Sequence, residues 1–261
     1  MAIVMIPILI WGDQYEIFNI FCLLLSIGAA WEFRKMFQIA KKLPIWLDLL
    51  TIILTGILSF VIIYSNQLSL LAVLLPIMLL AFIILGIMLI FVKDFNGLDF
   101  GNALTTIIYS SFGFSALALL RMLDIKYVIF MILAAMVTDL FAFIFGMKFG
   151  KHKLIPLVSP NKSVEGAIAG LVFGTLIASL YGIFGGVFGD GFPVYWIILI
   201  ALLLSCLSQI GDLVASKFKR TYGIKDYSNL FPGHGGIMDR FDSTTFAAMV
   251  FVVILALIEV F

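Results

Sequence analysis

The chain has 261 residues, of which 63% are hydrophobic and only 12% are charged. Soluble domains carry about 45–50% apolar and about 25% charged residues, so a water-soluble globular protein is excluded. The net charge of +1 gives no overall field for nucleic acid, and no nucleic-acid partner is expected. With 15% aromatic residues and a mean hydropathy of +1.20, the composition is that of a protein embedded in lipid.

Eight long apolar runs are the predicted membrane spans, because about 20 apolar residues cross a bilayer. In chain order they lie near residues 17–33, 47–64, 70–92, 103–120, 127–147, 165–186, 193–215 and 241–261. A ninth segment, 2–11, is short and contains Pro7, and it is either a half-span, a tilted segment or the tail of a longer helix. We find no repeat and no linker to a soluble part. The fold class is therefore predicted as all-α, one polytopic integral membrane helical bundle over residues 1–261 with about nine transmembrane helices.

The basic residues are distributed unevenly between the loops. If the short first segment crosses the membrane, the loops alternate sides, and one side holds all of the 16 Lys and Arg residues except Arg121 and Lys126. The positive-inside rule then places the loops 148–164 and 216–240 in the cytoplasm.

Ionisable residues within apolar spans are costly and indicate function. Asp139 is expected in the last two turns of its helix, and Asp212 is expected to close the helix 194–212. Glu32, which has basic residues beside it, is expected to mark the cytoplasmic end of its span. Both cysteines, Cys22 and Cys206, lie in apolar runs and are expected to be buried free thiols.

A polar segment precedes the span that begins near residue 165. Ser163 with Gly166, or Ser159 with Pro160, could form a helix cap or a substrate contact, because the same free N–H groups serve both purposes. His152 lies between two lysines and is expected to be an exposed loop residue.

The densest polar stretch covers residues 212–242. Its carboxylates are Asp212, Asp226, Asp239 and Asp242, and they alternate with Lys and Arg residues and with the glycines of the segment 232–236. Carboxylates can hold a divalent metal, cations can balance phosphate charge, and glycines allow backbone amides to approach closely, so this pattern suits a bound polyphosphate. A solvated basic loop on anionic lipid is the alternative, against which the carboxylates argue. His234 could be a general base, a metal ligand or a loop residue.

Residues 216–243, SKFKRTYGIKDYSNLFPGHGGIMDRFDS, resemble the signature of the phosphatidate cytidylyltransferases, also called CDP-diacylglycerol synthases. The matching positions are Ser216, Lys219, Arg220, Lys225, Asp226, Pro232, His234, Gly235, Gly236, Asp239, Arg240 and Asp242. A second block is similar to the family at Asp139, Gly146, Gly150, Lys151 and the segment 159–166, but Asn161, Ser163 and Val164 depart from the usual residues.

The resemblance implies transfer of a cytidylyl group from CTP to phosphatidate, with Mg²⁺ required and room for a second cation. It also implies a homodimer among membrane lipids, in a bacterial cell membrane, with the site facing the cytoplasm and the motifs in the part 130–245. The residues expected to be catalytic are Asp212, Asp239, Lys219, Arg220, Lys225, Asp226 and His234. Of these, Asp212 and Asp239 would hold the metal, and His234 would have a positioning role. The residues expected to bind substrate are Asp139, Lys151, Ser159, Lys162, Ser216, Gly235, Gly236 and Arg240.

Two other functions fit parts of the pattern. A CTP-dependent polyprenol or phytol kinase would release CDP instead of pyrophosphate, and the intact signature argues against it. A secondary transporter would have halves related by internal symmetry and charges near the midplane. We find no such symmetry, and the charged residues gather at one predicted face.

Overall fold

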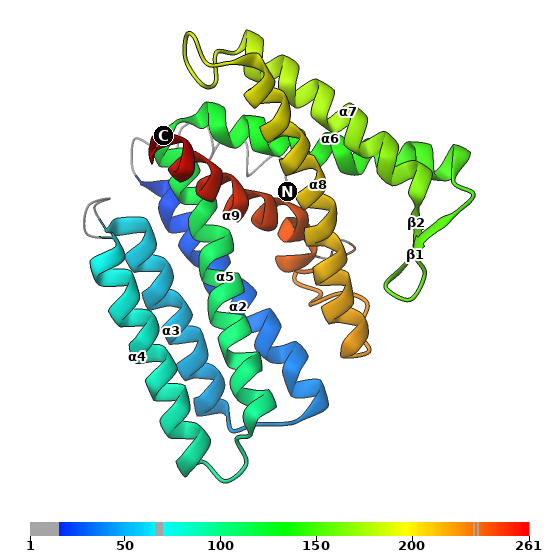
Figure 1. The fold of residues 1–261 in the computed structure, drawn as a ribbon. Helices are drawn as coiled ribbons and strands as arrows, with labels where there is room; N and C mark the ends of the chain where they lie inside the picture. The colour runs from blue at the N-terminus through cyan, green and yellow to red at the C-terminus, as the bar shows by residue number, and fades with distance from the viewer. Residues whose placement is uncertain (1–15, 66–69, 232, 234, 261) are drawn as a thin grey trace. The chain divides into compact units, whose positions relative to one another are not determined.

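The computed structural model describes residues 16–65, 70–231, 233 and 235–260 (Figure 1). The predicted short segment 2–11 and His234 lie outside these residues. The helices are α2 (Ile17–Ala40), α3 (Ile45–Tyr64), α4 (Leu70–Phe91), α5 (Gly97–Leu123), α6 (Ile125–Phe149), α7 (Val164–Phe184), α8 (Val194–Thr221) and α9 (Met238–Val260). Within the described part of the chain, all eight are long and apolar enough to cross a membrane, which confirms the eight predicted spans and the all-α class.

Three helices continue beyond the ends predicted from their apolar runs. Helix α8 ends nine residues after Asp212, α6 continues ten residues after Asp139, and α2 continues eight residues after Glu32. The prediction that Asp212 closes its helix is therefore wrong, and Asp139 lies about one turn further from the end of its helix than predicted. That Glu32 marks the end of a membrane span stays a prediction. An apolar run ends at the first polar residues, but a helix can continue through them because Lys, Arg and Ala favour the helical conformation.

The end of α8 is set by a glycine. Gly223 has a positive φ of 69°, its N–H donates to the Arg220 carbonyl at 3.2 Å, and the N–H of Ile224 donates to the Lys219 carbonyl at 2.9 Å. This is the Schellman pattern, which satisfies the last carbonyls of a helix and needs a residue that tolerates the left-handed region.

The chain forms two compact units, and we describe each by itself. The first unit comprises Met1–Ala118 and Asp226–Met238, and the second comprises Leu119–Lys225 and Asp239–Phe261. The signature segment 216–243 therefore contributes to both units. A single membrane domain over residues 1–261 stays a prediction.

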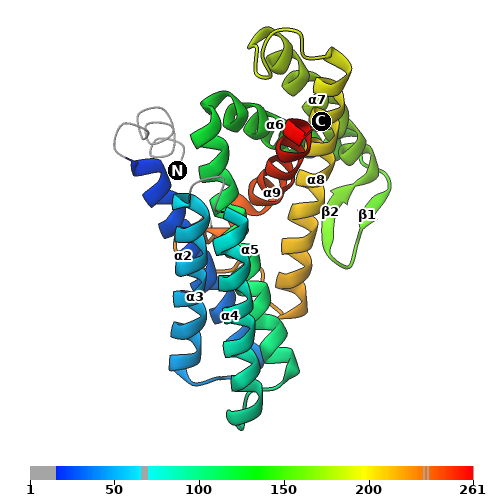
Figure 2. The same ribbon diagram turned by 60° about the vertical axis from the view of Figure 1, so that its left-hand side comes forward.

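In the first unit, α2, α3, α4 and the first part of α5 run side by side (Figure 2). Buried polar side chains join these helices. The hydroxyls of Ser26 and Ser59 lie 2.6 Å apart, and Ser111 Oγ donates to the Thr55 carbonyl at 3.1 Å. In an apolar bundle such hydrogen bonds satisfy groups that lipid cannot.

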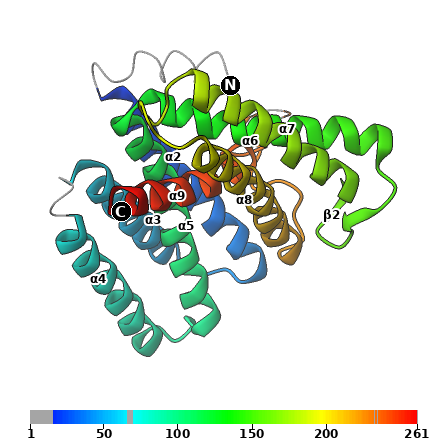
Figure 3. The same cartoon turned by 45° about the horizontal axis from the view of Figure 1, so that its top comes forward.

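In the second unit, α6 and α7 pack closely along their lengths (Figure 3). Glycines 166, 170 and 174 recur every four residues on α7, so they share one face of that helix. A Cβ at Gly166 would lie 2.5 Å from the Ala142 carbonyl oxygen, and one at Gly170 would lie 2.5 Å from that of Thr138. Only glycine permits this approach, which brings the helix of Asp139 close to α7.

A small antiparallel sheet joins α6 to α7, in a stretch where the sequence predicted only a polar loop. Strand β1 (Lys153–Ile155) pairs with β2 (Ser159–Ser163), with Lys153 opposite Ser163. Ser163 then accepts a hydrogen bond from the Gly166 N–H at 3.2 Å, which confirms the helix-cap alternative for this serine. The hairpin fixes where Lys162 lies relative to α7.

Candidate functional site

Polar side chains from α6, β2, α8 and α9 converge within the second unit. Lys162 Nζ lies 2.5 Å from Asp212 Oδ2, and Ser216 Oγ donates to Asp212 Oδ1 at 3.2 Å. Ser243 Oγ donates to Asp139 Oδ2 at 3.1 Å. The structure thus brings together four predicted site residues, Asp139, Lys162, Asp212 and Ser216. Ser243, which was not among the predicted site residues, lies with them.

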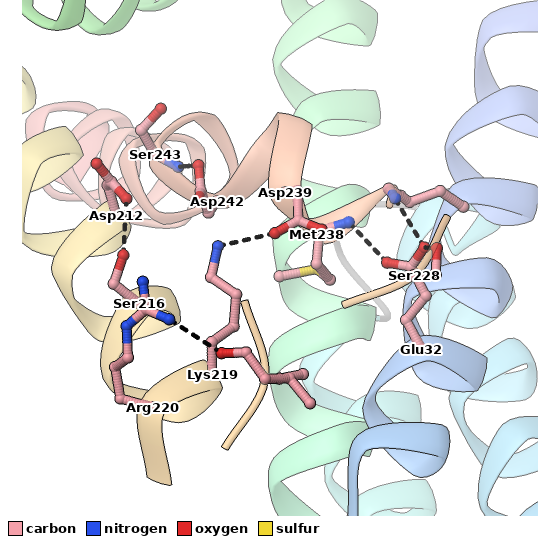
Figure 4. A network of polar contacts seen from close by, with 12 residues as sticks. Glu32, Asp212, Ser216, Lys219, Arg220, Ser228, Met238, Asp239, Asp242 and Ser243 are labelled. Carbon is pink, nitrogen blue, oxygen red and sulfur yellow. Dashed lines mark hydrogen bonds and ion pairs between the residues drawn. The ribbon is translucent and has the colours of Figure 1, made fainter. Parts of the chain in front are cut away.

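Asp242 adds a third carboxylate to this cluster. It lies close enough to both Asp212 and Asp139 for their charges to interact. Its own side chain also accepts from the Ser243 N–H at 2.8 Å, as Figure 4 shows. Asp242 matches the signature but was not among the predicted site residues. Its position three residues after Asp239, on the same helix face, was the available signal.

The spacing of residues along α8 explains why they act together. Asp212, Ser216 and Lys219 are separated by four and three residues, so they lie on one face of the helix. Gly211 lets α9 approach this face, because a Cβ there would lie 2.9 Å from the Asp242 carbonyl oxygen and 2.5 Å from Phe246 Cβ. The carboxylates of α8 and α9 are neighbours as a result.

Lys219 and Asp239 form a buried ion pair. Lys219 Nζ lies 2.8 Å from Asp239 Oδ1, and the two side chains are 11% and 4% exposed (Figure 4). Burying either charge alone is costly, so the pair depends on both partners. Lys162 and Asp212 are more open, with each side chain 26% exposed.

The other predicted residues of the second unit lie in varied surroundings. Arg220 donates from Nε to the Val158 carbonyl at 3.4 Å and from a terminal nitrogen to the Ile224 carbonyl at 3.2 Å. Ser159 begins β2 and is half-buried. Three further predicted residues are exposed, namely Lys151, Lys225 and Arg240.

Two predictions outside this cluster are also decided. His152 is exposed as predicted, and its Nδ1 lies 2.6 Å from Glu165 Oε1. Cys206 is exposed, so the prediction that it is buried is wrong, whereas Cys22 is buried. Cys206 lies on a helix whose outward face is apolar, and an apolar run by itself does not indicate burial inside the protein.

The first unit holds the glycine-rich part of the signature, including Asp226, Gly235 and Gly236. The Phe231 N–H donates to the Gly235 carbonyl at 3.0 Å, which closes a tight turn. Gly233 and Gly235 have φ values of 74° and 79°, a region that favours glycine. A Cβ at Gly236 would overlap the Glu32 carboxylate. Backbone conformation therefore favours glycine at 233 and 235, and the approach of the Glu32 side chain favours it at 236, while the contact of Gly235 and Gly236 with phosphate stays a prediction.

The acidic cluster has the chemistry of a Mg²⁺ site, since Mg²⁺ prefers oxygen ligands. Within the described ranges, no group of three or more His, Cys, Asp and Glu side chains is arranged as a metal site. Mg²⁺ is commonly held by one or two carboxylates together with substrate phosphates, so Asp212 and its neighbours still fit it. The metal roles of Asp212 and Asp239 stay predictions.

Comparison with known proteins decides the family. A model of the cytidylyltransferase family matches residues 1–258. The chain belongs to this family. Its relatives include a phosphatidate cytidylyltransferase of Staphylococcus saprophyticus subsp. saprophyticus, 36% identical over 167 residues, and one of Staphylococcus haemolyticus, 35% identical over 167 residues. A third, from Staphylococcus aureus, is 36% identical over 168 residues.

Each of these matches covers 64% of this chain and 63% of the relative. The chain thus matches somewhat less than two thirds of the relatives' length. The eight long apolar helices in the described part of the chain identify this member of the cytidylyltransferase family as an integral membrane protein, and the named relatives are bacterial.

Proposed function

We propose that the protein transfers a cytidylyl group from CTP to phosphatidate, giving CDP-diacylglycerol and pyrophosphate. The observation that carries this proposal is the cluster of Asp139, Lys162, Asp212 and Asp242 in the second unit, with the Lys219–Asp239 pair beside it on α8 and α9. The family match and the names of the relatives support the same reaction.

The reaction needs position and charge compensation more than covalent catalysis. A phosphatidate oxygen attacks the α-phosphorus of CTP, the new P–O bond forms, and the bond to the bridging oxygen of the leaving pyrophosphate breaks. The attacking phosphate is already anionic near neutral pH, so no strong general base is required. Binding both substrates in line is the main task of the protein.

Lys162 and Lys219 are the cations best placed for this task. Lys162 Nζ lies 2.5 Å from Asp212 of the cluster, and Lys219 Nζ lies 2.8 Å from Asp239 beside it. An ammonium in such a position can offset the phosphate charge that the carboxylates would otherwise repel. Arg220, in the last turn of α8, and Lys225, just after the helix, are exposed and would add positive charge near the triphosphate.

We further propose Mg²⁺ as the cofactor, with Asp212 and Asp239 as its protein ligands and Asp242 nearby. When bound, Mg²⁺ would reduce the repulsion between the phosphates of the two substrates. The carboxylates would keep the metal at the phosphates, and the lysines would balance the remaining charge.

The proposed setting is a bacterial membrane with the site on the cytoplasmic side, where CTP is available. The basic loops 148–164 and 216–240 support this orientation through the positive-inside rule. A homodimer is also proposed, from family resemblance alone.

The test uses the purified full chain in detergent with phosphatidate, Mg²⁺ and CTP labelled at the α-phosphate. Label in the lipid phase together with released pyrophosphate is the expected result, and chelation of Mg²⁺ should abolish it. Release of CDP with phosphorylation of an added polyprenol would instead identify a CTP-dependent lipid kinase. If no transfer occurs to phosphatidate or to the polyprenol, both the cytidylyltransferase and the kinase functions are contradicted.

A further inference from the structure

A buried carboxylate on α2 lies against the glycine-rich loop of the signature. The Glu32 side chain is fully buried, in a helix apolar enough to cross a membrane. A carboxylate in such surroundings is costly unless hydrogen bonds satisfy it, and intramembrane charges by default indicate function. Glu32 is not one of the residues that the signature contains.

Glu32 accepts three hydrogen bonds from both ends of this loop, as Figure 4 shows. Oε1 accepts from Ser228 Oγ at 2.6 Å and from the Ile237 N–H at 2.8 Å. Oε2 accepts from the Met238 N–H at 2.9 Å. The donors are themselves buried, so these hydrogen bonds are shielded from water.

One of these donors, the Met238 N–H, is the first of α9, and another, the Ile237 N–H, belongs to the residue directly before the helix. The first N–H groups of a helix have no partner within the helix, and a Ser, Thr, Asp or Asn side chain at the preceding position normally accepts from them. Here that position is Ile237, which has no acceptor. The Glu32 carboxylate instead accepts from the first of these groups, the Met238 N–H, and its negative charge suits the positive end of the helix dipole.

The same face of α2 is shaped to receive the loop. Gly28, four residues before Glu32, leaves room that the Ile237 side chain fills, and Gly236 passes the carboxylate where no Cβ would fit. Phe33 contacts Tyr227 ring edge to face, with centroids 5.3 Å apart. The loop is therefore held at Tyr227, at Ser228 and again at residues 236–238.

We propose that Glu32 is a positioning residue of the nucleotide site: it caps α9 and fixes the loop 227–238 in the form that binds CTP. This proposal rests on the proposed function, because it takes the signature loop as part of the CTP site. Met238, whose N–H Glu32 accepts, is the first residue of α9, so Glu32 fixes the last residue of the loop at the point where the helix begins.

The test compares Glu32→Gln with Ser26→Ala in the full chain in detergent. Glutamine keeps the size, and its carbonyl oxygen can still accept, but its NH2 group cannot, so the donors at one of the two carboxylate oxygens lose their acceptor and the negative charge is removed. Ser26 lies on the same helix, is buried, and bonds Ser59 instead of the loop, so it is the matched control. Amide hydrogen exchange of residues 227–240, CTP affinity, and kcat and KM are measured for each.

Glu32→Gln should raise exchange at residues 237 and 238 and weaken CTP binding by about tenfold to a hundredfold, since a buried hydrogen bond to a charged group is lost. Exchange in α6 and α7 should not change. Ser26→Ala should leave both CTP affinity and loop exchange as in the wild type.

A second comparison tests the contact between Glu32 and Gly236. Gly236→Ala alone should weaken CTP binding, because the new methyl group would overlap the carboxylate. In a Glu32→Ala background the same change should cost much less, so the two effects should not add. Fully additive effects would contradict the proposed contact.

Three results would overturn the inference: loosened loop exchange with unchanged CTP affinity, weakened affinity with unchanged loop exchange, or the same changes in Ser26→Ala. Wild-type protein that binds CTP but transfers nothing to phosphatidate would count against the proposed function alone. Wild-type protein that does not bind CTP would overturn both.

Discussion

Asp212 is the residue at which most of the described contacts of the acidic cluster meet. It pairs with Lys162 at 2.5 Å, accepts from Ser216 at 3.2 Å, and interacts with the charge of Asp242. The Asp212 and Lys162 side chains are each 26% exposed, and solvent-exposed ion pairs contribute about 1 kcal/mol or less to the free energy of unfolding. Its contribution to folding is therefore small beside its proposed role.

We predict that Asp212→Asn lowers kcat by about 10²–10³-fold, the usual cost of removing one preorganised electrostatic contact. The unfolding temperature should change little. Transfer of label from CTP to lipid measures kcat, and thermal unfolding in detergent measures the unfolding temperature. Asp190→Asn, in the exposed loop after α7, is the control and should keep full activity. A kcat for Asp212→Asn within twofold of the wild type would remove this residue from the site.

The Lys219–Asp239 pair calls for a different design, because both side chains are almost fully buried. Asp239→Asn alone should abolish transfer but also destabilise the protein by roughly 3–5 kcal/mol, since a buried ammonium loses its carboxylate. The double variant Lys219→Met with Asp239→Leu should regain stability, because apolar residues of similar volume often replace a buried pair at no cost. It should remain inactive. Recovery of both stability and activity would show that the pair is structural.

At the scale of the helices, the sequence predicts much of the architecture. All eight described helices coincide with predicted apolar runs, because lipid imposes length and hydropathy directly. The ends of α2 and α8 could not be read from hydropathy, which reports the preference for lipid and not for helix. Gly223 was the sequence signal for the end of α8. The hairpin 153–163 has only short, mostly polar strands and no alternating pattern to predict it.

The crossing of α8 and α9 makes the acidic cluster sensitive to one methyl group. At Gly211, a Cβ would lie 2.5 Å from Phe246 Cβ and 2.9 Å from the Asp242 carbonyl oxygen. We predict that Gly211→Ala lowers stability by about 1–3 kcal/mol, the usual cost of overpacking, and reduces kcat because Asp242 moves relative to Asp212. Thermal unfolding and the transfer assay measure these effects.

Gly86→Ala in α4 is the matched control, because a Cβ there meets nothing within 4 Å. Alanine should raise helix stability by up to about 1 kcal/mol and leave transfer unchanged. If Gly211→Ala behaved like Gly86→Ala, the close approach of α8 and α9 would not position the carboxylates.

At the scale of the whole chain, the motif residues were predictable but their partners were not. The signature is contiguous in sequence, yet Asp226–Met238 belongs to the first compact unit and its flanks to the second. Glu32 bonds Ile237 across 205 positions, which no local pattern can reveal. Its neighbours Arg34 and Lys35 made it look like the end of a span, whereas Arg34 is buried and pairs with Asp48 at 2.5 Å.

The predicted orientation can be tested with two positions that flank α7. In a Cys22→Ala, Cys206→Ser background, Lys153→Cys places a thiol on the hairpin and Asp190→Cys places one in the loop after α7. The 21 residues of α7 span about 30 Å, enough to cross the hydrocarbon core, so the two thiols should lie on opposite sides. A membrane-impermeant maleimide should label only the cysteine at 190 in intact cells, and both after permeabilisation. Labelling of the cysteine at 153 alone would place the acidic cluster outside, where CTP is not available, and labelling of both would mean that α7 does not cross the membrane.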